Sequence, residues 1–586
     1  MKRRFFFYII VLTTAIVFNN CRKELPNQPK ANQLPTTRLW LQSDQTLLES
    51  SSRQHLYWYG EDPDGTVSGF VISIVTSRLP NAQLPNPDTL TYFWTTKTDG
   101  ILPLPLLQAR DSFTIVVRAI DNVFQSSSLT EGAIIKMSPQ PFWDVNKDGV
   151  FDNGDIALPT LSYGIDPIGA VQLFPLRNTP PTVHFIGDPA AQDTTIPVQQ
   201  PLYTYPAATF SWSANDIDGN NTIAGFRIAL NDTSSSSSWS QLLSPATTTI
   251  TLFVPRNATD VAGNVVDAEL YAGTYPNLQF RGTVTGLRLD NTNRLYLKAL
   301  DVAGEYSKTV RMPDSTSPAN NRTWYVKKPQ SKMLFVLDYG ASASTEKNAI
   351  IPYYRNILSN LTILNGSLSN FDTLDVVTNQ PYNLNPALIK TLQLYDVVLW
   401  VTNRFPSIKP AQIGLFNYTQ SGGKVIFSTT FATALSYADL RALNDFAPLD
   451  STTSDNVNSG NTPPTNADSR IYWKTAGSRV KVNSMINGYP DLTVDSVTVT
   501  GATIDTTGAH TLNMRRIYKR TDSQYIYRLD SSLTNPPRYL GSPTIACIDN
   551  NKSFLMFALP LHIMNGNPKN LPLFFKHVLE DEFGIK

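Results

Sequence analysis

Residues 57–65 read Tyr-Trp-Tyr-Gly-Glu-Asp-Pro-Asp-Gly, and residues 211–219 read Ser-Trp-Ser-Ala-Asn-Asp-Ile-Asp-Gly. Each stretch is a strand-like run around a tryptophan that ends in an acidic turn. A glycine–phenylalanine pair follows both, at 69–70 and at 225–226. Asp-Gly is first of all a turn-forming pair, because glycine tolerates positive φ. Both stretches therefore predict a strand, a tight turn and a second strand.

The similarity extends to the far end of each unit, where residues 116–122 (Val-Val-Arg-Ala-Ile-Asp-Asn) correspond to residues 296–302 (Tyr-Leu-Lys-Ala-Leu-Asp-Val). Matching beginnings and ends predict a duplicated domain. The sequence thus predicts two antiparallel β-sandwiches, at residues 38–137 and 178–327. The central tryptophan, the Asp-x-Asp-Gly turn and the late Ala-x-Asp run resemble fibronectin type III or immunoglobulin-like domains of bacterial surface proteins. Such a resemblance concerns the fold, since these sandwiches have many functions.

Length and charge narrow the class of protein. A chain of 586 residues has room for roughly three or four domains. Charged residues make up 16% of the chain, below the ~25% usual for soluble globular proteins, which fits an exported β-rich protein. Lysine and arginine total 48 against 47 aspartates and glutamates, so the net charge provides no field that would attract nucleic acid. Nucleic acid is therefore not an expected partner.

The N-terminus has the layout of a signal peptide, predicted at residues 1–20. Three basic residues follow Met1, and residues 5–18 are uncharged and mostly apolar. This run would form only about 21 Å of helix, which is short of a hydrocarbon core of about 30 Å. Residues 21–37, rich in Pro, Asn and Gln, are predicted to be a flexible tether.

The residues before Cys21, Phe-Asn-Asn, resemble the lipobox of bacterial lipoproteins, although two asparagines stand where small residues are usual. The resemblance implies that Cys21 becomes lipidated. It implies a cell-envelope location, most readily the outer membrane, with the membrane as a partner through the lipid anchor. The alternative is an ordinary signal peptide, or an uncleaved anchor, with an incidental cysteine.

One motif predicts a metal site, in residues 138–177, which are expected to link the sandwiches. Residues 144–155 have the spacing of a twelve-residue calcium loop, with Gly149 at the sharp turn of position 6. The expected ligands at positions 1, 3, 5, 7, 9 and 12 are Asp144, Asn146, Asp148, Val150 (through its carbonyl), Asp152 and Asp155. The loop resembles those of EF-hands and dockerins, but prolines flank it, so no long helices frame it. We expect a structural calcium ion here; an acidic turn without an ion is the alternative.

Residues 328–586 have a different pattern, in which apolar strands alternate with helices. Buried strands are expected at 333–337, 396–402 and 424–428, with helices between them. This alternation predicts a doubly wound α/β domain of flavodoxin-like type, with a polar loop inserted at 451–469. The order of elements resembles class I glutamine amidotransferases and their non-catalytic relatives. The nucleophilic cysteine of that family is missing here.

In a doubly wound sheet, ligands bind at the carboxyl ends of the strands. The candidate cleft there comprises Asp338, Asn403 and Ser428, with His562 where the resembled family has its late histidine. A serine hydrolase using Ser428 and His562 is one alternative, but the glycines of Gly-x-Ser-x-Gly are absent. We expect a binding protein for a protein or glycan ligand rather than an enzyme, with the sandwiches as spacers. A third possibility is a structural assembly subunit, which predicts an apolar or aromatic patch on a sandwich face.

Overall fold

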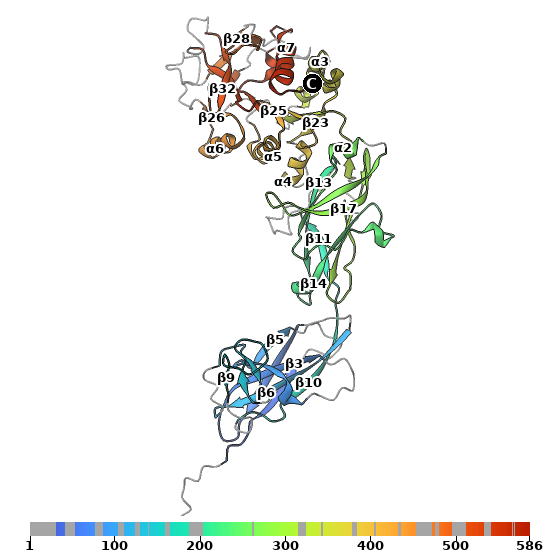
Figure 1. Ribbon diagram of the computed structural model, residues 1–586, viewed down its shortest axis with the longest axis vertical. Helices are drawn as coiled ribbons and strands as arrows, with labels where there is room; N and C mark the ends of the chain where they lie inside the picture. The colour runs from blue at the N-terminus through green and yellow to red at the C-terminus, as the bar shows by residue number, and fades with distance from the viewer. Residues whose placement is uncertain are drawn as a thin grey trace, which may run out of the picture. The chain divides into compact units, whose positions relative to one another are not determined.

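The structure is a computed structural model of the chain (Figure 1). It describes residues 31–41, 53–76, 86–103, 110–123, 129–138, 140–158, 164–186, 203–260, 263–313, 324–340, 344–377, 384–402, 406–429, 431, 435–452, 471–474, 480–494, 511–531, 541–564, 566–567 and 569–585. Cys21, Asn403, the signal peptide and nearly all of the predicted loop insertion lie outside these residues. None of the helices in the described ranges is both long and apolar enough to cross a membrane.

The protein is multidomain and mostly β-sheet, with sandwich-like sheets. Contacts divide it into two compact units, which are described separately. The first unit holds one sandwich, with sheets of order β1-β2-β5 and β10-β6-β3-β4-β7-β8-β9. Its elements are β1 (Thr36–Leu41), β2 (Arg53–Glu61), β3 (Val67–Thr76), η1 (Pro87–Thr89), β4 (Thr91–Thr95), β5 (Asp99–Pro103), β6 (Arg110–Asp121), β7 (Ile134–Lys136), β8 (Phe142–Trp143), β9 (Ile156–Ala157) and β10 (Ala170–Arg177).

The larger sheet of this sandwich is buried on both faces. Phe70 and Ile72 of β3 pack with Trp58 of the smaller sheet, whereas Val71 between them belongs to a second cluster with Trp94 of β4. Alternating residues of a strand point to opposite faces, so β3 contributes to two cores. This explains why three consecutive residues of the strand, Phe70 to Ile72, are all apolar.

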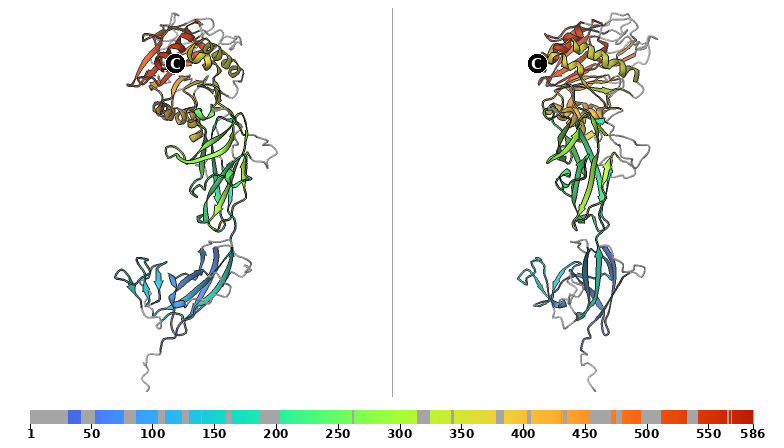
Figure 2. Two further views of the ribbon diagram at one scale, coloured as in Figure 1. Left: turned by 45° about the vertical axis from the view of Figure 1, so that its right-hand side comes forward. Right: turned by 90° about the vertical axis from the view of Figure 1, so that its right-hand side faces the viewer.

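The predicted boundary of the first sandwich differs from the structure. The supposed linker, residues 138–177, contributes β8, β9 and β10 to the larger sheet. β10 pairs with β6 along eight residues, from the Ala170–Val117 pair to the Arg177–Arg110 pair. Figure 2 shows the strands β7 to β9, coloured cyan to teal, to one side of the two packed sheets. The acidic loop therefore lies inside the first sandwich, between β8 and β9, rather than at a hinge.

The second sandwich has sheets of order β11-β13-β15-β16-β17, β14-β19-β20 and β12-β21-β18. Its elements are β11 (Thr182–Ile186), β12 (Tyr203–Thr204), β13 (Ala207–Asn215), η4 (Asn220–Thr222), β14 (Ile223–Leu230), η5 (Ser236–Ser238), β15 (Thr249–Phe253), α2 (Arg256–Thr259), β16 (Val265–Ala272), β17 (Gln279–Arg288), β18 (Asn291–Asn293), β19 (Leu295–Asp301), β20 (Val310–Met312) and β21 (Trp324–Val326).

The internal repeat is confirmed down to a β-bulge. The register of β3 on β6 shifts between Val67 and Gly69, and that of β14 on β19 shifts between Ile223 and Gly225. A Cβ atom at Gly69 would collide with the Trp94 ring, and one at Gly225 with a backbone carbonyl. Glycine is thus required at the same place in both copies.

The C-terminal region has one nine-stranded sheet of order β23-β22-β24-β25-β34-β33-β32-β28-β29, in which the first five strands are parallel. The strands of the region are β22 (Met333–Asp338), β23 (Asp372–Asp375), β24 (Val397–Thr402), β25 (Lys424–Ser428), β26 (Leu449–Thr452), β27 (Ile471–Lys474), β28 (Val480–Ser484), β29 (Leu492–Val494), β30 (Thr511–Met514), β31 (Ile517–Lys519), β32 (Ser523–Leu529), β33 (Thr544–Asp549) and β34 (Phe554–Phe557). Of these, β26 pairs with β31 and β27 with β30 in two further sheets of two strands each. Its helices are α3 (Ser344–Ser359), η6 (Ile363–Asn370), α4 (Leu384–Leu392), α5 (Ile408–Gln420), α6 (Tyr437–Phe446), η7 (Leu561–Ile563), α7 (Asn570–Lys576) and the π-helix η8 (His577–Glu582).

Helices cover both faces of the parallel strands. Phe335 and Leu337 of β22 belong to a core with residues of α3 and α7, while Leu334 and Val336 belong to a core with residues of α4, α5 and α6. The predicted strands at 333–337, 396–402 and 424–428 are confirmed, with helices between them.

The second core extends into the second sandwich, which belongs to the same compact unit. The Tyr205 hydroxyl donates to the Thr373 carbonyl at 3.1 Å. Lys390 of α4 lies over the rings of Phe253 and Tyr271, at 4.6 and 4.5 Å from their centroids. One end of this sandwich therefore supports α4 directly.

Candidate functional site

Asp338 ends β22 at the carboxyl edge of the parallel strands, as predicted, but it is fully buried. Its carboxylate accepts hydrogen bonds from the Ser407 hydroxyl and the Ser407 backbone N–H, both at 2.6 Å. The Trp400 indole N–H donates to the same carboxylate at 3.3 Å. Asp338 thus fastens the segment that begins α5 to the end of the sheet.

Ser428, at the end of β25, is likewise buried and bonded to the backbone. Its hydroxyl accepts from the Leu561 N–H at 2.8 Å and donates to the Leu559 carbonyl at 3.4 Å. His562 is the residue after Leu561, and it is only 2% exposed. Asn403, the remaining predicted cleft residue, lies outside the described residues.

Ser428 and His562 do not form a nucleophile–base pair. The serine proton is directed to a backbone carbonyl, and burial lowers the pKa of the His562 imidazole to about 3. A general base with so low a pKa binds a proton weakly at neutral pH. Within the described part of the chain, the Nδ1 atom of His562 has no hydrogen-bond partner. The hydrolase alternative finds no support in this geometry.

Three tyrosines lie near His562, on α3 and at the end of β22. We call Tyr339, Tyr353, Tyr354 and His562 the tyrosine–histidine cluster. Tyr339 directly follows β22, and Tyr353 and Tyr354 lie on α3. The Tyr354 ring is 5.6 Å from the Tyr353 ring and 6.4 Å from the His562 ring. The cluster therefore joins the ends of β22 and β34 on one face of the sheet.

Several buried polar atoms of the described residues lack a hydrogen-bond partner, and hydroxyls of this cluster are among them. Tyr339 is fully buried, and among the residues that the structure describes its hydroxyl has no hydrogen-bond partner; the same holds for the Tyr353 hydroxyl. Burial raises the pKa of Tyr339 well above its usual value, and the nearby carboxylate of Glu346 raises it further. Buried polar groups are paired in the great majority of proteins, so each exception requires an explanation.

The second candidate is the acidic loop between β8 and β9. Gly149 has φ +82°, and its N–H donates to Asp144 Oδ2 at 3.0 Å, which folds the loop back on its first residue. Asp155 Oδ1 accepts from the Val145 N–H at 2.9 Å. This bond holds Asp155, the last predicted ligand, next to the residue that follows Asp144, the first one. The predicted sharp turn at Gly149 is confirmed.

Two further predicted ligands converge on the amide of Asn146. Its Nδ2 atom lies 3.0 Å from Asp148 Oδ2 and 3.3 Å from Asp152 Oδ2. Asp144 is 2% exposed, and its Oδ1 atom lacks a hydrogen-bond partner in the described structure. Over the same residues, no three His, Cys, Asp or Glu side chains stand together in an arrangement ready to hold a metal. The loop has oxygen donors of the kind that calcium takes, held by internal hydrogen bonds.

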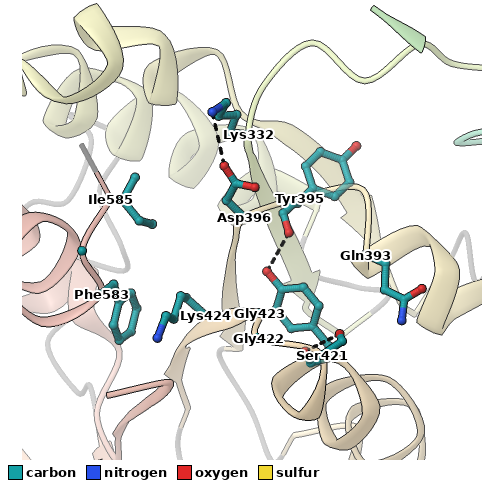
Figure 3. A pocket seen from close by; sticks show the side chains of 12 residues that line it. Lys332, Gln393, Tyr395, Asp396, Ser421, Gly422, Gly423, Lys424, Phe583 and Ile585 are labelled. Atoms are coloured by element: carbon teal, nitrogen blue, oxygen red, sulfur yellow. Dashed lines mark hydrogen bonds and ion pairs between the residues drawn. The ribbon is translucent and has the colours of Figure 1, made fainter. Parts of the chain in front are cut away.

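A cavity of about 600 Å³ lies at the opposite end of the parallel strands (Figure 3). Lys332, Asp396 and Lys424, at the starts of β22, β24 and β25, line it. Lys332 and Asp396 form an ion pair of 3.5 Å, which Figure 3 marks. The Tyr418 hydroxyl donates to the Tyr395 carbonyl at 2.9 Å. The polar groups that these contacts join are thus already paired.

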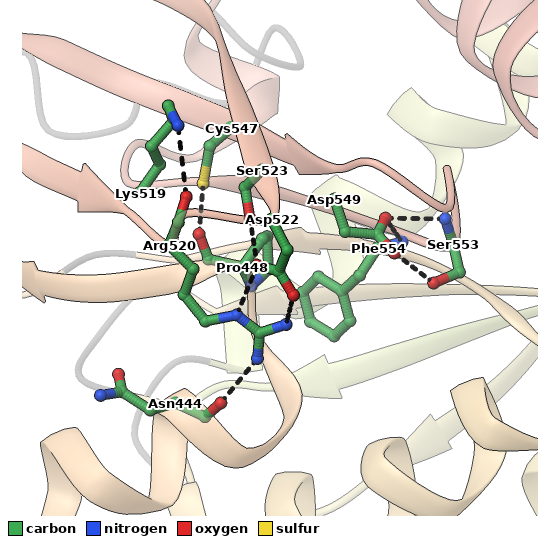
Figure 4. Close-up of polar contacts among 10 residues, drawn as sticks. All are labelled: Asn444, Pro448, Lys519, Arg520, Asp522, Ser523, Cys547, Asp549, Ser553 and Phe554. Carbon is green, nitrogen blue, oxygen red and sulfur yellow. Dashed lines mark hydrogen bonds and ion pairs between the residues drawn. The ribbon is translucent and has the colours of Figure 1, made fainter.

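A second cavity, of about 550 Å³, lies beside Arg520 and Asp549. Figure 4 shows the polar contacts of these residues. The Arg520 guanidinium donates to Asp522 Oδ1 at 2.9 Å and to the Asn444 carbonyl at 2.8 Å. Next to it, burial raises the pKa of the Cys547 thiol to about 12, and its sulfur contacts the Pro448 carbonyl at 3.3 Å. A thiol with so high a pKa is a poor nucleophile at neutral pH, so this cysteine is a packing residue.

A scan of known protein families finds no match, and a search of curated proteins finds none either. Among solved structures, a ThuA-like protein from Bacteroides uniformis is 14% identical, with 45% of this chain and 96% of that protein covered and a TM-score of 0.26. The fibronectin(III)-like modules of CbhA from Clostridium thermocellum are 10% identical, covering 50% and 94%, with a TM-score of 0.13. The FN1–FN3 domains of chicken CNTN1 are also 10% identical, covering 48% and 97%, with a TM-score of 0.13. At such scores these similarities say nothing about function.

Proposed function

We propose that the chain is a lipid-anchored cell-envelope protein whose C-terminal α/β domain binds a small polar ligand without turnover. The order β23-β22-β24-β25-β34 is the 2-1-3-4-5 order of flavodoxin-like sheets, which supports a doubly wound domain. In such domains the ligand lies at the carboxyl ends of the strands, beside the point where the strand order reverses, which here is between β22 and β24. Tyr339 is the residue that directly follows β22.

The observation that carries this proposal is the buried hydroxyl of Tyr339, which has no hydrogen-bond partner among the described residues. His562, whose Nδ1 also lacks a partner there, lies beside Tyr354 of the same cluster. An unsatisfied buried polar group destabilises a protein by about 1–3 kcal/mol. Functional sites keep such groups because the ligand supplies the missing partner. A neutral imidazole and phenol hydroxyls offer both donors and acceptors, which suits a polar, uncharged ligand group.

Tyr339→Phe is expected to stabilise the ligand-free protein by about 1 kcal/mol, because it removes a hydroxyl that has lost its water without gaining a partner. Hydrogen exchange of α3 in the full-length chain, followed by mass spectrometry, measures this change as slower exchange.

Tyr418→Phe is the matched control, since Tyr418 is equally buried but its hydroxyl binds the Tyr395 carbonyl. This variant should exchange faster near α5, by a factor corresponding to about 1 kcal/mol. If Tyr339→Phe also accelerated exchange, the Tyr339 hydroxyl would have an internal partner. The proposal of a ligand site at Tyr339 would then be wrong.

The envelope location rests on the signal-peptide layout and on Cys21. Cys21→Ala is expected to abolish incorporation of labelled palmitate and to move most of the protein from the membrane fraction to the soluble fraction, because a lipid chain contributes about 0.8 kcal/mol per buried CH₂. Palmitate labelling and fractionation of cells expressing the full-length chain measure both effects.

Cys547→Ala is the control, because Cys547 is the second of the two cysteines and is buried within the C-terminal sheet. It should label and fractionate as the unchanged chain does. Equal membrane association of the Cys21→Ala chain would point to an uncleaved peptide anchor instead.

We further propose that the loop from Asp144 to Asp155 binds a structural calcium ion that holds the β8–β9 hairpin at the edge of the first sandwich. The unpaired Oδ1 of the buried Asp144 side chain supports this proposal, together with the convergence of Asp148 and Asp152 on one amide. Extracellular modules bind calcium at about 0.1–1 mM, a range suited to the outside of a cell.

A further inference from the structure

The outer face of the small sheet β1-β2-β5 carries aromatic side chains, of which Trp40 and Tyr59 are exposed among the residues that the structure describes. Side chains alternate along β2: Leu56 and Trp58 point into the core, with at most 2% exposure, so His55, Tyr57 and Tyr59 point outward. The strand register adds residues of both neighbours to the same face. Trp40 of β1 and Asp99 of β5 both lie opposite Tyr57.

The rings on this face are nearly parallel. The Trp40 and Tyr57 centroids are 6.3 Å apart with an interplanar angle of 16°, and the His55 and Tyr57 centroids are 4.7 Å apart with an angle of 24°. Trp40 is 48% exposed and Tyr59 is 52% exposed. We call Trp40, His55, Tyr57 and Tyr59 the aromatic platform.

Polar groups border the aromatic platform. His55 Nε2 lies 2.7 Å from Asp99 Oδ2, and both side chains remain partly exposed. Arg38, which is exposed, pairs in register with Tyr59 at the other end. A row of stacked rings with half-exposed Trp40 and Tyr59 is thus flanked by hydrogen-bonding groups of both charge signs.

We propose that the aromatic platform binds a glycan, with pyranose rings packed against the exposed parts of Trp40 and Tyr59 and sugar hydroxyls bonded to Asp99 and His55. A pyranose has an apolar face of C–H groups and an equatorial rim of hydroxyls, and the aromatic platform offers the complement of each. Small-molecule sites commonly combine aromatic surface with a few placed polar groups in this way. The borders carry a carboxylate, an imidazole and a guanidinium, so a neutral sugar chain fits better than a charged one.

Area favours a glycan over a protein partner. The exposed parts of Trp40, Tyr59 and the neighbouring Ile101 amount to roughly 300–400 Å², given that large aromatic side chains present about 150–250 Å² each. A stable protein interface buries about 800 Å² on each partner. Two or three stacked sugar rings need no more surface than the aromatic platform provides.

This inference does not depend on the proposed ligand site of the C-terminal domain, because the aromatic platform belongs to the first sandwich. It assigns a binding role to a domain that the sequence suggested was a spacer. Failure of either hypothesis leaves the other intact.

Calorimetric titration of the full-length chain with cellohexaose, chitohexaose and xylohexaose tests the inference. At least one of the three is expected to bind saturably. Trp40→Ala should weaken that binding by roughly tenfold or more, as removal of an aromatic hot-spot residue does. Trp40→Phe keeps a ring, so its affinity for the sugar should lie between that of the unchanged chain and that of Trp40→Ala. Because Trp40 is half-exposed, both variants are expected to remain folded.

Phe280→Ala is the control, since Phe280 is an equally exposed aromatic residue, 57%, on β17 of the second sandwich. It should bind the sugar as the unchanged chain does. The inference is overturned if none of the three oligosaccharides binds or if Trp40→Ala binds equally well. It is also overturned if sedimentation shows self-association that Trp40→Ala abolishes, because the face would then be a protein interface.

Discussion

Lowering the pH from 6.5 to 4 is expected to destabilise the C-terminal α/β region by about 3 kcal/mol through His562 alone. His562 is 2% exposed, and burial lowers the pKa of its imidazole to about 3. In the unfolded chain the same group has a pKa of about 6.5. Between these values the unfolded chain binds a proton that the folded chain does not bind.

The direction of the effect follows from this difference. The folded state is favoured fully above pH ~6.5, and each pH unit below that value removes about 1.4 kcal/mol until the folded pKa is reached. Carboxylates also titrate in acid, so the total loss exceeds this part. The contribution of His562 is the difference between the unchanged chain and a variant without the imidazole.

His562→Phe isolates that contribution, because phenylalanine keeps an aromatic ring beside Tyr354 and cannot be protonated. Hydrogen exchange of β34 and α3 is compared between the two full-length chains at each pH, so intrinsic exchange rates cancel. His562→Gln repeats the comparison if the larger ring disturbs packing. A difference between chains that stays constant from pH 7 to pH 4 would contradict a buried neutral imidazole.

The sequence predicted the parallel strands of the C-terminal region well because their apolar runs are long and bounded by glycine, proline and helix caps. Lys424 to Ser428, directly after Gly422 and Gly423, is such a case: the predicted strand and β25 coincide. The repeat was also visible, because the tryptophan, turn and bulge glycine recur at matching positions. Local pattern decides these elements.

The extent of the first sandwich was not predictable in the same way. β8 and β9 are two residues each, too short for any period to show, and β10 contains Pro175 within the run that pairs with β6. Proline within a run argues against a strand unless the strand lies at an edge, and β10 is the edge of its sheet. Tertiary pairing, which the sequence does not display, gives these residues their structure.

The candidate site, too, was predictable only where local sequence pattern decides the structure. Asp338 and Ser428 were correctly expected at strand ends, but periodicity does not reveal that both are buried and hydrogen-bonded to other groups of the domain. The tyrosines were missed because an aromatic residue after a strand or within a helix is usually core. One signal was present: Tyr339 follows Asp338 directly at the end of an apolar strand, the position where α/β domains place ligand-binding residues.

About 10 mM calcium is expected to stabilise the first sandwich by about 1.4–2.7 kcal/mol, if the dissociation constant lies in the 0.1–1 mM range of extracellular modules. The ion would supply a partner for the unpaired Oδ1 of Asp144 and replace the Asn146 amide between Asp148 and Asp152. Hydrogen exchange of residues 140–158 in the full-length chain, with calcium or with a chelator, measures the effect.

Asp144→Asn gives the sharper result. Relative to the unchanged chain, we expect the variant hairpin to be at least as stable in chelator but less stable in calcium. In chelator, the amide removes a buried negative charge whose Oδ1 is unpaired in the described structure, so the hairpin should be at least as stable as in the unchanged chain. In calcium, the variant should gain little, because it lacks the charge that draws the cation. Asp64→Asn, in the exposed turn between β2 and β3, should respond to calcium as the unchanged chain does. A variant that was less stable in chelator and equally stabilised by calcium would make Asp144 a turn residue rather than a ligand. If calcium did not stabilise the unchanged chain, the loop would be a hairpin that needs no ion.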